Sequence, residues 1–284
     1  MKNVAIFAKV HDPRCQDVAD ELVGWLRERG CNPLVEAHLA RHLSTETGVE
    51  RGDIPGRADL VVVLGGDGTL ISVARLMGDL EVPILAVNLG SLGFLTEITL
   101  DELYSSLERV LKGEFSVSER MMLRCRLLRN GAEIGSHVVL NDVVVNKGAL
   151  ARIIDLEAFV DDNYLTTFKS DGLIISSPTG STGYSLSANG PIVHPAVNCI
   201  LITPICSHTL TNRPVVVSRD SKIRATLISK DEDVYLTLDG QVGVELRSGD
   251  VLEVWRAEHR TRLIMSGSRD FFEVLRMKLK WGER

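Results

Sequence analysis

The chain has 284 residues, of which 44% are hydrophobic and 25% are charged, and its formal net charge is −6. This length predicts two domains, the composition is typical of a globular protein, and the negative charge argues against nucleic acid or an acidic membrane as a partner. No apolar run approaches the roughly 20 residues of a membrane span, and the amino-terminal residues lack a signal peptide's apolar core, so we expect a cytoplasmic protein.

The first 57 residues alternate strand and helix patterns before the pattern dissolves. Residues 3–10 read as a strand, residues up to Arg29 carry apolar side chains at helical spacing, and Leu34 and Val35 begin a second strand. Residues 37–57 are polar and contain several glycines and a proline. We interpret them as a mobile surface loop, which would serve either as a lid or only as a connection.

The chain is organised around the next stretch, where a buried strand runs into a glycine turn and then into a helix. The unbroken apolar run 61–64 is typical of a parallel strand covered on both faces. Gly65, Gly66 and Gly68 follow it, and we expect Thr69 to cap the helix. A helix start at the carboxyl end of a parallel strand favours phosphate binding, so residues 65, 66, 68 and 69 form a candidate phosphate loop.

Asp67 is unusual within this loop because a carboxylate opposes phosphate binding. It therefore needs a task, such as accepting a proton from an attacking hydroxyl or holding a metal beside the phosphate. The alternative is that the four residues from Gly65 to Gly68 form only a tight turn, with Asp67 as a turn former or helix cap.

The remainder of the first half continues the same alternation. A buried strand is predicted over residues 82–87, a second glycine-bearing loop over 88–94, and a helix over 101–112. Residues 1–115 therefore predict a Rossmann-like α/β domain, with a parallel sheet between layers of helices.

From residue 116 the pattern changes to short apolar runs that are separated by turn signals. These signals are Asn130-Gly131, residues 161–163, residues 231–233 and Asp239-Gly240. Residues 116–263 therefore predict a β-sandwich-like domain. The amphipathic segment 269–281 predicts a helix, and we expect residues 264–284 to pack back on the first domain.

Two stretches of the β-rich half carry polar groups that a plain sandwich does not need. Asn141 and Asp142 interrupt apolar strand formers, and their donors and acceptors match the hydroxyls of a ribose, although a simple strand end would explain them as well. Residues 169–187 gather small hydroxyl residues and glycines around one aromatic, Tyr184. Such a loop can wrap a flat polar ligand; the alternative is a solvated serine-rich linker.

Together these stretches resemble a known family. The GGDGT sequence at 65–69 is similar to a signature shared by NAD kinases, lipid kinases of the diacylglycerol and sphingosine type and, more loosely, 6-phosphofructokinases. With Asn141-Asp142 and DGLIISSPTGSTGYSLSANGPIVHP at 171–195, the chain resembles the NAD kinases over most of its length. Ser177 and Gly183 depart from the family's usual threonine and alanine, which leaves the rigidity of this loop open.

The resemblance implies transfer of the γ-phosphoryl group of ATP to the adenosine-ribose 2′-hydroxyl of NAD, giving NADP and ADP, with Mg²⁺ accompanying ATP. It implies Asp67 as the catalytic base, substrates NAD and ATP, and a homodimer or homotetramer. The residues that it implies as contacts of NAD are Asp67, Gly68, Asn141, Asp142, Arg152, Lys169, Asp171, Thr182, Gly183, Tyr184, Ser185, Leu186, Ser187 and Gln241.

Other functions fit the sequence less well. A lipid or sugar kinase would share the GGDGT loop, but no amphipathic membrane-facing stretch is present. A dehydrogenase would need a third glycine where Ile71 stands, and no P-loop motif occurs. A nucleotide-binding regulator without catalysis stays open. Neither the seven histidines nor the five cysteines show metal-ligand spacing, so we expect reduced thiols and no metal held by the protein.

Overall fold

The structure is a computed structural model, and it describes residues 1–43, 47–90, 92–149, 152–230 and 233–282. Ser91 of the expected glycine loop, residues 44–46 of the expected lid loop, residues 231–232 of one expected turn and the last two residues lie outside the described residues. The chain divides into two compact units, one formed by residues 1–119 and 261–284 and the other by residues 120–260.

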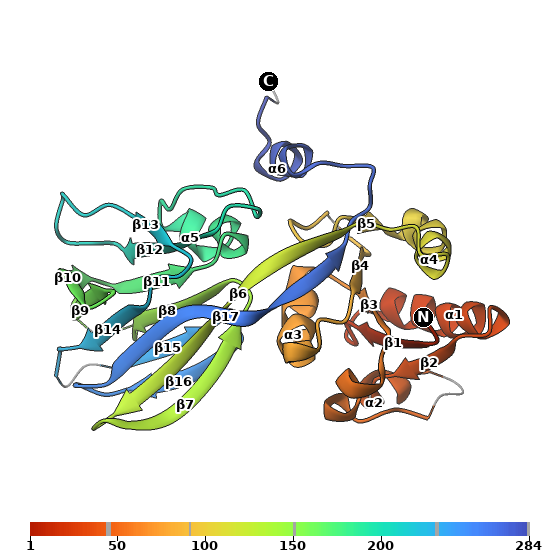
Figure 1. Ribbon diagram of the computed structural model, residues 1–284, viewed down its shortest axis with the longest axis horizontal. Helices are drawn as coiled ribbons and strands as arrows, with labels where there is room; N and C mark the ends of the chain where they lie inside the picture. Colours follow the sequence, from red (N-terminus) through yellow and green to blue (C-terminus); the bar gives the residue numbers. More distant parts are fainter. Residues whose placement is uncertain (44–46, 91, 150–151, 231–232, 283–284) are drawn as a thin grey trace. The chain divides into compact units, whose positions relative to one another are not determined.

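Unit 1 is built on a parallel sheet, shown in Figure 1. Its strands are β1 (Asn3–Ala8), β2 (Asn32–Val35), β3 (Leu60–Leu64), β4 (Ile84–Asn88) and β5 (Ile98–Thr99), and the main ones follow the order β2-β1-β3-β4. Val62 pairs with Ile6 on one side and Leu85 on the other, and the five residues of β3 are all buried. The unbroken apolar run thus marks a central strand, because helices cover both of its faces.

Helices cover the two faces of this sheet. Figure 1 shows α1 (Pro13–Glu28) and α4 (Leu103–Leu111) on one face and α3 (Asp67–Met77) on the other. α1 begins with the cap Asp12 and Pro13, and its apolar stripe packs into one core with residues of α4 and the sheet. The carboxy-terminal helix α6 (Phe271–Leu279) follows the last strand and belongs to this unit. The predicted α/β architecture is confirmed.

Residues 37–43 and 47–57 are more ordered than the composition of this stretch indicated. The described part contains α2 (Ala37–Ala40) and the 3₁₀ turns η1 (Arg51–Asp53) and η2 (Pro55–Arg57). Leu39 and Ile54 are fully buried, and Arg51 donates a hydrogen bond of 2.6 Å to the hydroxyl of Ser72 on α3. Two apolar anchors among polar residues are a weak pattern, so the sequence did not reveal these attachments.

Unit 2 consists of two sheets that share one core. One sheet contains β6 (Val117–Arg129), β7 (Ala132–Val139), β9 (Ile154–Val160), β10 (Asn163–Ser170), β14 (Ile223–Leu227) and β17 (Val251–Ile264). The six-stranded sheet has the order β13 (Val215–Ser218), β12 (Cys199–Ile205), β11 (Gly172–Ser176), β8 (Asp142–Lys147), β15 (Val234–Leu238), β16 (Val242–Leu246). Buried side chains from both sheets form a single apolar cluster, which confirms the predicted sandwich-like class.

The expected hairpin turns explain how these strands are connected. Asn130 and Gly131 have φ values of 51° and 78° and join β6 to β7, while Asp239 and Gly240, at 51° and 65°, join β15 to β16. Asparagine, aspartate and glycine tolerate this left-handed conformation, which matches the twist of the paired strands.

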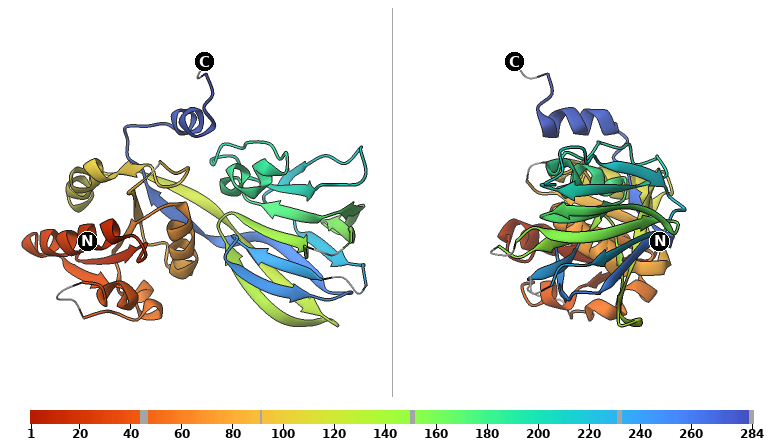
Figure 2. Two further views of the ribbon diagram at one scale, coloured as in Figure 1. Left: turned by 180° about the vertical axis from the view of Figure 1, so that it is seen from behind. Right: turned by 90° about the vertical axis from the view of Figure 1, so that its left-hand side faces the viewer.

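Alternation along β8 produces the surface on which the candidate site lies. Val143 and Val145 point into the shared core, whereas Val144 belongs to a small cluster on the opposite face, with Ile174, Ile205 and Ala188. The 3₁₀ turn η5 (Thr179–Thr182) and the short helix α5 (Tyr184–Ser187) follow β11, and α5 lies beside β11 in Figures 1 and 2.

Among the described residues, no helix is long and apolar enough to cross a membrane.

Candidate active site

Asp67 lies at the carboxyl end of β3, where the glycine turn leads into α3. Gly66 is the residue that precedes the helix, and Asp67 and Gly68 occupy its first two positions. Thr69 is not the cap that we predicted, because it already lies in the first turn and its N–H donates to the carbonyl of Gly66 at 3.0 Å. The glycine turn places the helix start three residues earlier than the capping pattern indicated, because Gly66 and not Thr69 precedes the helix.

The carboxylate of Asp67 is held by the turn that follows β4. The backbone N–H of Phe94 donates to Oδ2 at 2.9 Å, and those of Leu95 and Thr96 donate to Oδ1 at 3.2 and 3.1 Å. The Thr96 hydroxyl donates to Oδ1 as well, at 3.0 Å. In the described part of the chain, Oδ1 therefore accepts three hydrogen bonds and Oδ2 one. Donors of this kind stabilise the charged form of a carboxylate and fix its orientation.

Two further residues support this arrangement, and the sequence analysis missed both roles. The side-chain amide of Asn88, the last residue of β4, donates to the Thr96 hydroxyl at 3.0 Å. Gly93 lies so close to Asp67 that a Cβ there would overlap both Asp67 Oδ1 and Thr96 Oγ1. The expected glycine loop 88–94 was the available signal, but nothing in the sequence indicated what its glycine faces.

Unit 2 carries a polar cavity of about 440 Å³ on the outer face of the six-stranded sheet. It brings together three of the predicted residues, Asn141, Asp142 and Tyr184. Residues that were not predicted complete its lining: Val144, Asn146, Thr237, Asp239 and Gly240. The Asn141 Oδ1 atom is buried and has no hydrogen-bond partner among the described residues. It can therefore accept a hydrogen bond from a hydroxyl or amide of a ligand.

Asp239 fixes the backbone beside this cavity. Its carboxylate accepts hydrogen bonds from the N–H groups of Leu140 at 3.0 Å, Asn141 at 2.7 Å and Asp142 at 3.1 Å. Burial and, secondly, the negative charge of Asp239 raise the pKa of the Asp142 carboxyl from its usual 3.8 to about 7. Asp142 therefore holds its proton below about pH 7 and, in that form, can donate a hydrogen bond as well as accept one.

The hydroxyl-rich segment after β11 is folded on itself, which corrects part of our interpretation. The hydroxyls of Ser177 and Ser181 donate to the carbonyls of Leu140 and Pro178, each at 2.6 Å, and Ser185 is bonded to Thr203 at 3.0 Å. These hydroxyls are used inside the protein, where they hold the segment together and attach it to Leu140 and Thr203. The segment is not a serine-rich linker, because residues 179–182 and 184–187 form helical turns and several of its side chains are buried.

Glycines bring this segment against Asn141, the residue that precedes β8. A Cβ at Gly180 would overlap the carbonyl oxygen of Asn141. One at Gly183 would lie 3.3 Å from the Gly180 carbonyl and 3.6 Å from Asn141 Nδ2, so the alanine usual in the resembled family would fit with a small adjustment.

The other predicted contacts are spread more widely over unit 2. Tyr184 and Ser187 also line a second cavity of about 570 Å³, and Gln241 is an exposed residue of the turn beside Gly240. Lys169 lies on β10 of the other sheet, with its ammonium 4.0 Å from Asp155. The remaining positions are a partly exposed Thr182 and Leu186, an exposed Arg152, and Asp171 with its carboxylate 3.7 Å from the ammonium of Lys147.

The described residues contain no cluster of three or more His, Cys, Asp or Glu side chains that could hold a metal ion. The Asp67 carboxylate faces backbone N–H groups and a hydroxyl, which are donors and not metal ligands.

Unit 1 holds an oriented carboxylate at the start of a helix after a parallel strand, and unit 2 holds a polar cavity with a ready acceptor. Such features are typical of a two-domain phosphotransferase that acts on a polar substrate. The family models for the ATP-NAD kinase N-terminal and C-terminal domains match residues 4–115 and 140–266. The chain belongs to the ATP-NAD kinase family.

Curated relatives agree with this assignment. The NAD kinases of Geotalea daltonii and Geobacter sulfurreducens are each 70% identical to the chain over 284 residues, and the alignments cover both proteins completely.

Solved structures show the same fold. A crystal structure of yeast NADH kinase complexed with NADH has a TM-score of 0.92 at 28% identity, with 100% of this chain and 89% of that chain covered. The fold is also that of an NAD kinase from Archaeoglobus fulgidus in complex with ATP, with a TM-score of 0.78 at 22% identity over 97% and 99% of the two chains.

Proposed function

We propose that the chain is an NAD kinase, which transfers the γ-phosphoryl group of ATP to the adenosine-ribose 2′-hydroxyl of NAD and produces NADP and ADP. Its family and its relatives at 70% identity support this reaction. The observation that carries the mechanism is the Asp67 carboxylate, which four donors hold at the carboxyl end of β3.

The proposed role of Asp67 is that of general base. Because Oδ1 accepts three hydrogen bonds and Oδ2 one, Oδ2 is the oxygen with capacity left for the proton of the ribose hydroxyl. As that proton moves to Oδ2, the 2′-oxygen bonds to the γ-phosphorus and the bond to the bridging oxygen of ADP breaks. The start of α3, with Gly65, Gly66, Gly68 and Thr69, is proposed to attract the phosphates through its aligned N–H dipoles.

The dinucleotide is proposed to bind through the polar cavity of unit 2. There the Asn141 side-chain oxygen would accept from a ligand hydroxyl or amide, and Asp142 would exchange hydrogen bonds with ribose hydroxyls. Tyr184, which is 42% exposed at the rim, offers its ring to a flat ligand. The other expected contacts, which stay proposals, are Gly68, Arg152, Lys169, Asp171, Thr182, Gly183, Ser185, Leu186, Ser187 and Gln241; for Ser185 only backbone groups suit this role, because Thr203 engages its hydroxyl.

Three further properties belong to this proposal. The divalent cation is Mg²⁺ that arrives with ATP and neutralises charge on the transferred group when bound. The enzyme is a homodimer or homotetramer. It acts in the cytoplasm, in keeping with the absence of a membrane-spanning helix among the described residues.

The test is an assay with NAD, ATP and Mg²⁺ in which NADP is detected by an NADP-specific dehydrogenase. The wild type should form NADP, and Asp67→Asn should turn over about 10² to 10⁴ times more slowly, which is the usual worth of a general base. Asp20→Asn, which alters an exposed carboxylate on α1, is the control. Near-normal turnover by Asp67→Asn would contradict the role of Asp67. If neither protein forms NADP from ATP, parallel assays with polyphosphate and with NADH ask whether the donor or the acceptor differs.

A further inference from the structure

The turn that holds Asp67 is itself attached to the carboxy-terminal segment of the chain. Within the turn 94–97, Phe94, Leu95 and Thr96 donate to the Asp67 carboxylate through three backbone N–H groups and one hydroxyl. These donors keep their positions only if the turn has a single conformation. The carboxylate alone does not determine the path of the backbone around it. The contacts on the other side of the turn therefore matter for the position of Asp67.

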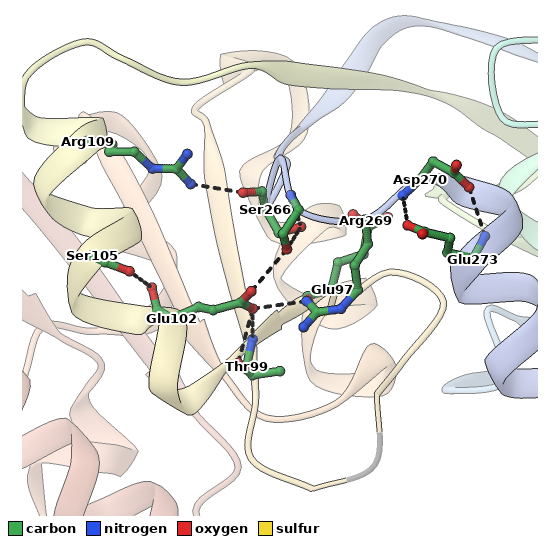
Figure 3. Close-up of polar contacts among 10 residues, drawn as sticks. Glu97, Thr99, Glu102, Ser105, Arg109, Ser266, Arg269, Asp270 and Glu273 are labelled. Carbon is green, nitrogen blue, oxygen red and sulfur yellow. Dashed lines mark hydrogen bonds and ion pairs between the residues drawn. The ribbon is translucent and has the colours of Figure 1, made fainter.

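Arg269 makes the contact at one end of this turn. Its Nη1 donates to the carbonyl oxygen of Glu97 at 2.9 Å and to Glu102 Oε2 at 3.0 Å, and Figure 3 shows the guanidinium pointing between these two residues. Glu97 follows Thr96, whose N–H and hydroxyl both donate to Asp67. Arg269 and Asp67 thus hold neighbouring residues of the same turn.

Glu102 gives Arg269 a fixed partner. Its Oε2 also accepts from the N–H and the hydroxyl of Thr99, at 2.9 and 3.0 Å, and its Oε1 accepts from Ser268 at 3.0 Å. The side chains of Arg269 and Glu102 are only 25% and 28% exposed. A charged pair with several further hydrogen bonds keeps its geometry better than an isolated pair at the surface.

The other end of the turn touches α6. The ammonium of Lys278 lies 5.6 Å from the centre of the Phe94 ring, within the range of a cation–π contact. The backbone N–H of Phe94 is the donor to Asp67 Oδ2, the oxygen assigned to proton transfer. Residues 269 and 278 therefore contact both ends of the turn that orients the carboxylate.

We propose that Arg269 is a positioning residue for phosphoryl transfer, which fixes the 94–97 turn and, through it, the carboxylate of Asp67. This proposal rests on the proposed role of Asp67 as the general base. Arg269 does not touch substrate in this role. Its loss lets the turn move away from Asp67, so that the carboxylate samples orientations in which Oδ2 does not meet the ribose hydroxyl.

Arg109 provides a matched control within the same unit. Its Nη2 donates to the carbonyl oxygen of Ser266 at 2.9 Å, so it holds the same carboxy-terminal segment, but no hydrogen bond is drawn from it to Glu97 or Glu102 in Figure 3. Arg109→Gln loosens the segment without releasing the Glu97 carbonyl. Comparison with Arg269→Gln therefore separates an effect on the turn from a general loss of attachment.

The experiment measures kcat, KM for NAD and ATP, and Tm for both variants in the full-length protein. Arg269→Gln should lower kcat about 10- to 100-fold, the scale expected for a misplaced catalytic group, with both KM values changed less than about threefold. Arg109→Gln should lower Tm comparably and keep kcat within about twofold of the wild type. An equal loss of kcat in both variants, or an unchanged kcat in Arg269→Gln, overturns the proposal.

A double-mutant cycle with Asp67→Asn tests whether Arg269 acts through Asp67. In the Asp67→Asn background, Arg269→Gln should lower kcat no further, because the group that it positions has already lost its function. If the loss of kcat in the double variant equals the product of the losses in the two single variants, Arg269 acts by another route, and the inference is contradicted. If Asp67→Asn alone is nearly as active as the wild type, the proposed role of Asp67 as general base is wrong. An effect of Arg269→Gln on kcat would then need an explanation other than the positioning of Asp67.

Arg269→Lys keeps the positive charge beside Glu102, and it provides a second test of the proposal if Arg269→Gln does not fold. The shorter side chain should retain the ion pair and give up the Glu97 carbonyl, so kcat should still fall while Tm stays close to that of the wild type. Full activity of Arg269→Lys would show that the charge alone is needed and would overturn the role of the Glu97 contact.

Discussion

Asp67, the proposed general base, shows how far the orientation of a side chain can depend on residues that carry no reactive group. The motif around it indicated a carboxylate in a glycine turn, but the hydrogen bonds that orient it come from residues 27 to 29 positions later in the chain. Three of the four hydrogen bonds come from backbone N–H groups, which every residue type except proline possesses. The glycine loop 88–94 was the available signal, but nothing in the sequence indicated that the side chains of Asn88 and Thr96 belong to the network that fixes the carboxylate.

Gly93→Ala tests this network directly. The added methyl group would overlap Asp67 Oδ1 and Thr96 Oγ1, so it should displace the carboxylate and lower kcat about 10²-fold or more while the protein remains folded. Gly90→Ala is the matched control in the same loop, since its methyl group would meet only Asn88 Oδ1, at 3.8 Å. Steady-state kinetics and Tm of both variants check the prediction. Wild-type turnover in Gly93→Ala would show that the turn adapts without moving the base.

Asp142 leads to a prediction about pH. Its pKa in the folded protein is about 7, above its ordinary value of 3.8, so between these values the folded state holds a proton that the unfolded state has released. The free energy of unfolding should therefore decrease as pH rises from about 4 to 7, by the contribution of this group. Asp142→Asn should remove that contribution. Its free energy of unfolding, compared with that of the wild type at the same pH, should therefore be more favourable at pH 8 than at pH 4.

Urea unfolding of the wild type and Asp142→Asn at several pH values gives the difference between their free energies of unfolding. Asp101→Asn, which changes an exposed carboxylate in unit 1, serves as the reference variant. A difference between wild type and Asp142→Asn that is the same at pH 4 and pH 8 would show that Asp142 does not hold its proton in the folded state. NAD binding should weaken in Asp142→Asn if the proposed contact with ribose is correct.

At the scale of elements, local patterns predicted the strands and turns well and the hydroxyl-rich segment less well. Asn130-Gly131 and Asp239-Gly240 were recognised because left-handed turns require particular residues, whatever the tertiary contacts are. Residues 169–187 were expected to present hydroxyls to a ligand, yet Ser177, Ser181 and Ser185 bond inside the protein. A hydroxyl that faces a ligand and one that satisfies a buried carbonyl look alike in a sequence.

Asp239 has a local role and a long-range role. It forms the turn before β16, and its carboxylate also holds the start of β8. Asp239→Ala would leave the N–H groups of Leu140, Asn141 and Asp142 without their acceptor and would place alanine at a φ of 51°. We expect the free energy of unfolding to fall by about 3 kcal/mol, with weaker NAD binding. Asp239→Asn keeps one acceptor oxygen and tolerates this φ, so it should lose less than half as much. Equal losses in urea unfolding would show that the charge, and not the hydrogen bonds, is what stabilises β8.

For the whole molecule, the sequence predicted the two architectures because each has its own period along the chain. Alternating strands and helices indicated a parallel sheet, and short strands with turn residues indicated a sandwich. The attachments between distant segments were not predictable in the same way. Arg269 and Glu102 are 167 residues apart, and neither stands in a recognisable motif. The expected return of residues 264–284 to the first domain rested only on an amphipathic pattern, whereas Arg269 and Lys278 supply specific contacts within unit 1.

The attachment of this segment should depend on acid because Glu102 is its main acceptor. Burial alone would raise the pKa of Glu102, but hydrogen bonds from Thr99, Arg269 and Ser268 outweigh it and lower the pKa from 4.5 to about 2. The unfolded state therefore takes up a proton at higher pH than the folded state does. The contribution of Glu102 to stability is fully present above about pH 4.5 and is lost as pH falls through about 2.

Glu102→Gln should consequently be less stable than the wild type at pH 7, and the difference between the two free energies of unfolding should shrink steadily between about pH 4.5 and 2. Denaturant unfolding at pH 7, 4, 3 and 2 measures this difference, and Glu273→Gln, which alters the cap of α6 without touching Arg269 in Figure 3, controls for a general response of the segment to acid. A difference that persists unchanged at pH 2 would mean that Glu102 stabilises the protein through packing and not as a carboxylate. The wild type would then keep its carboxy-terminal segment attached in acid, and the hydrogen bonds from Thr99, Ser268 and Arg269 would not need the charge.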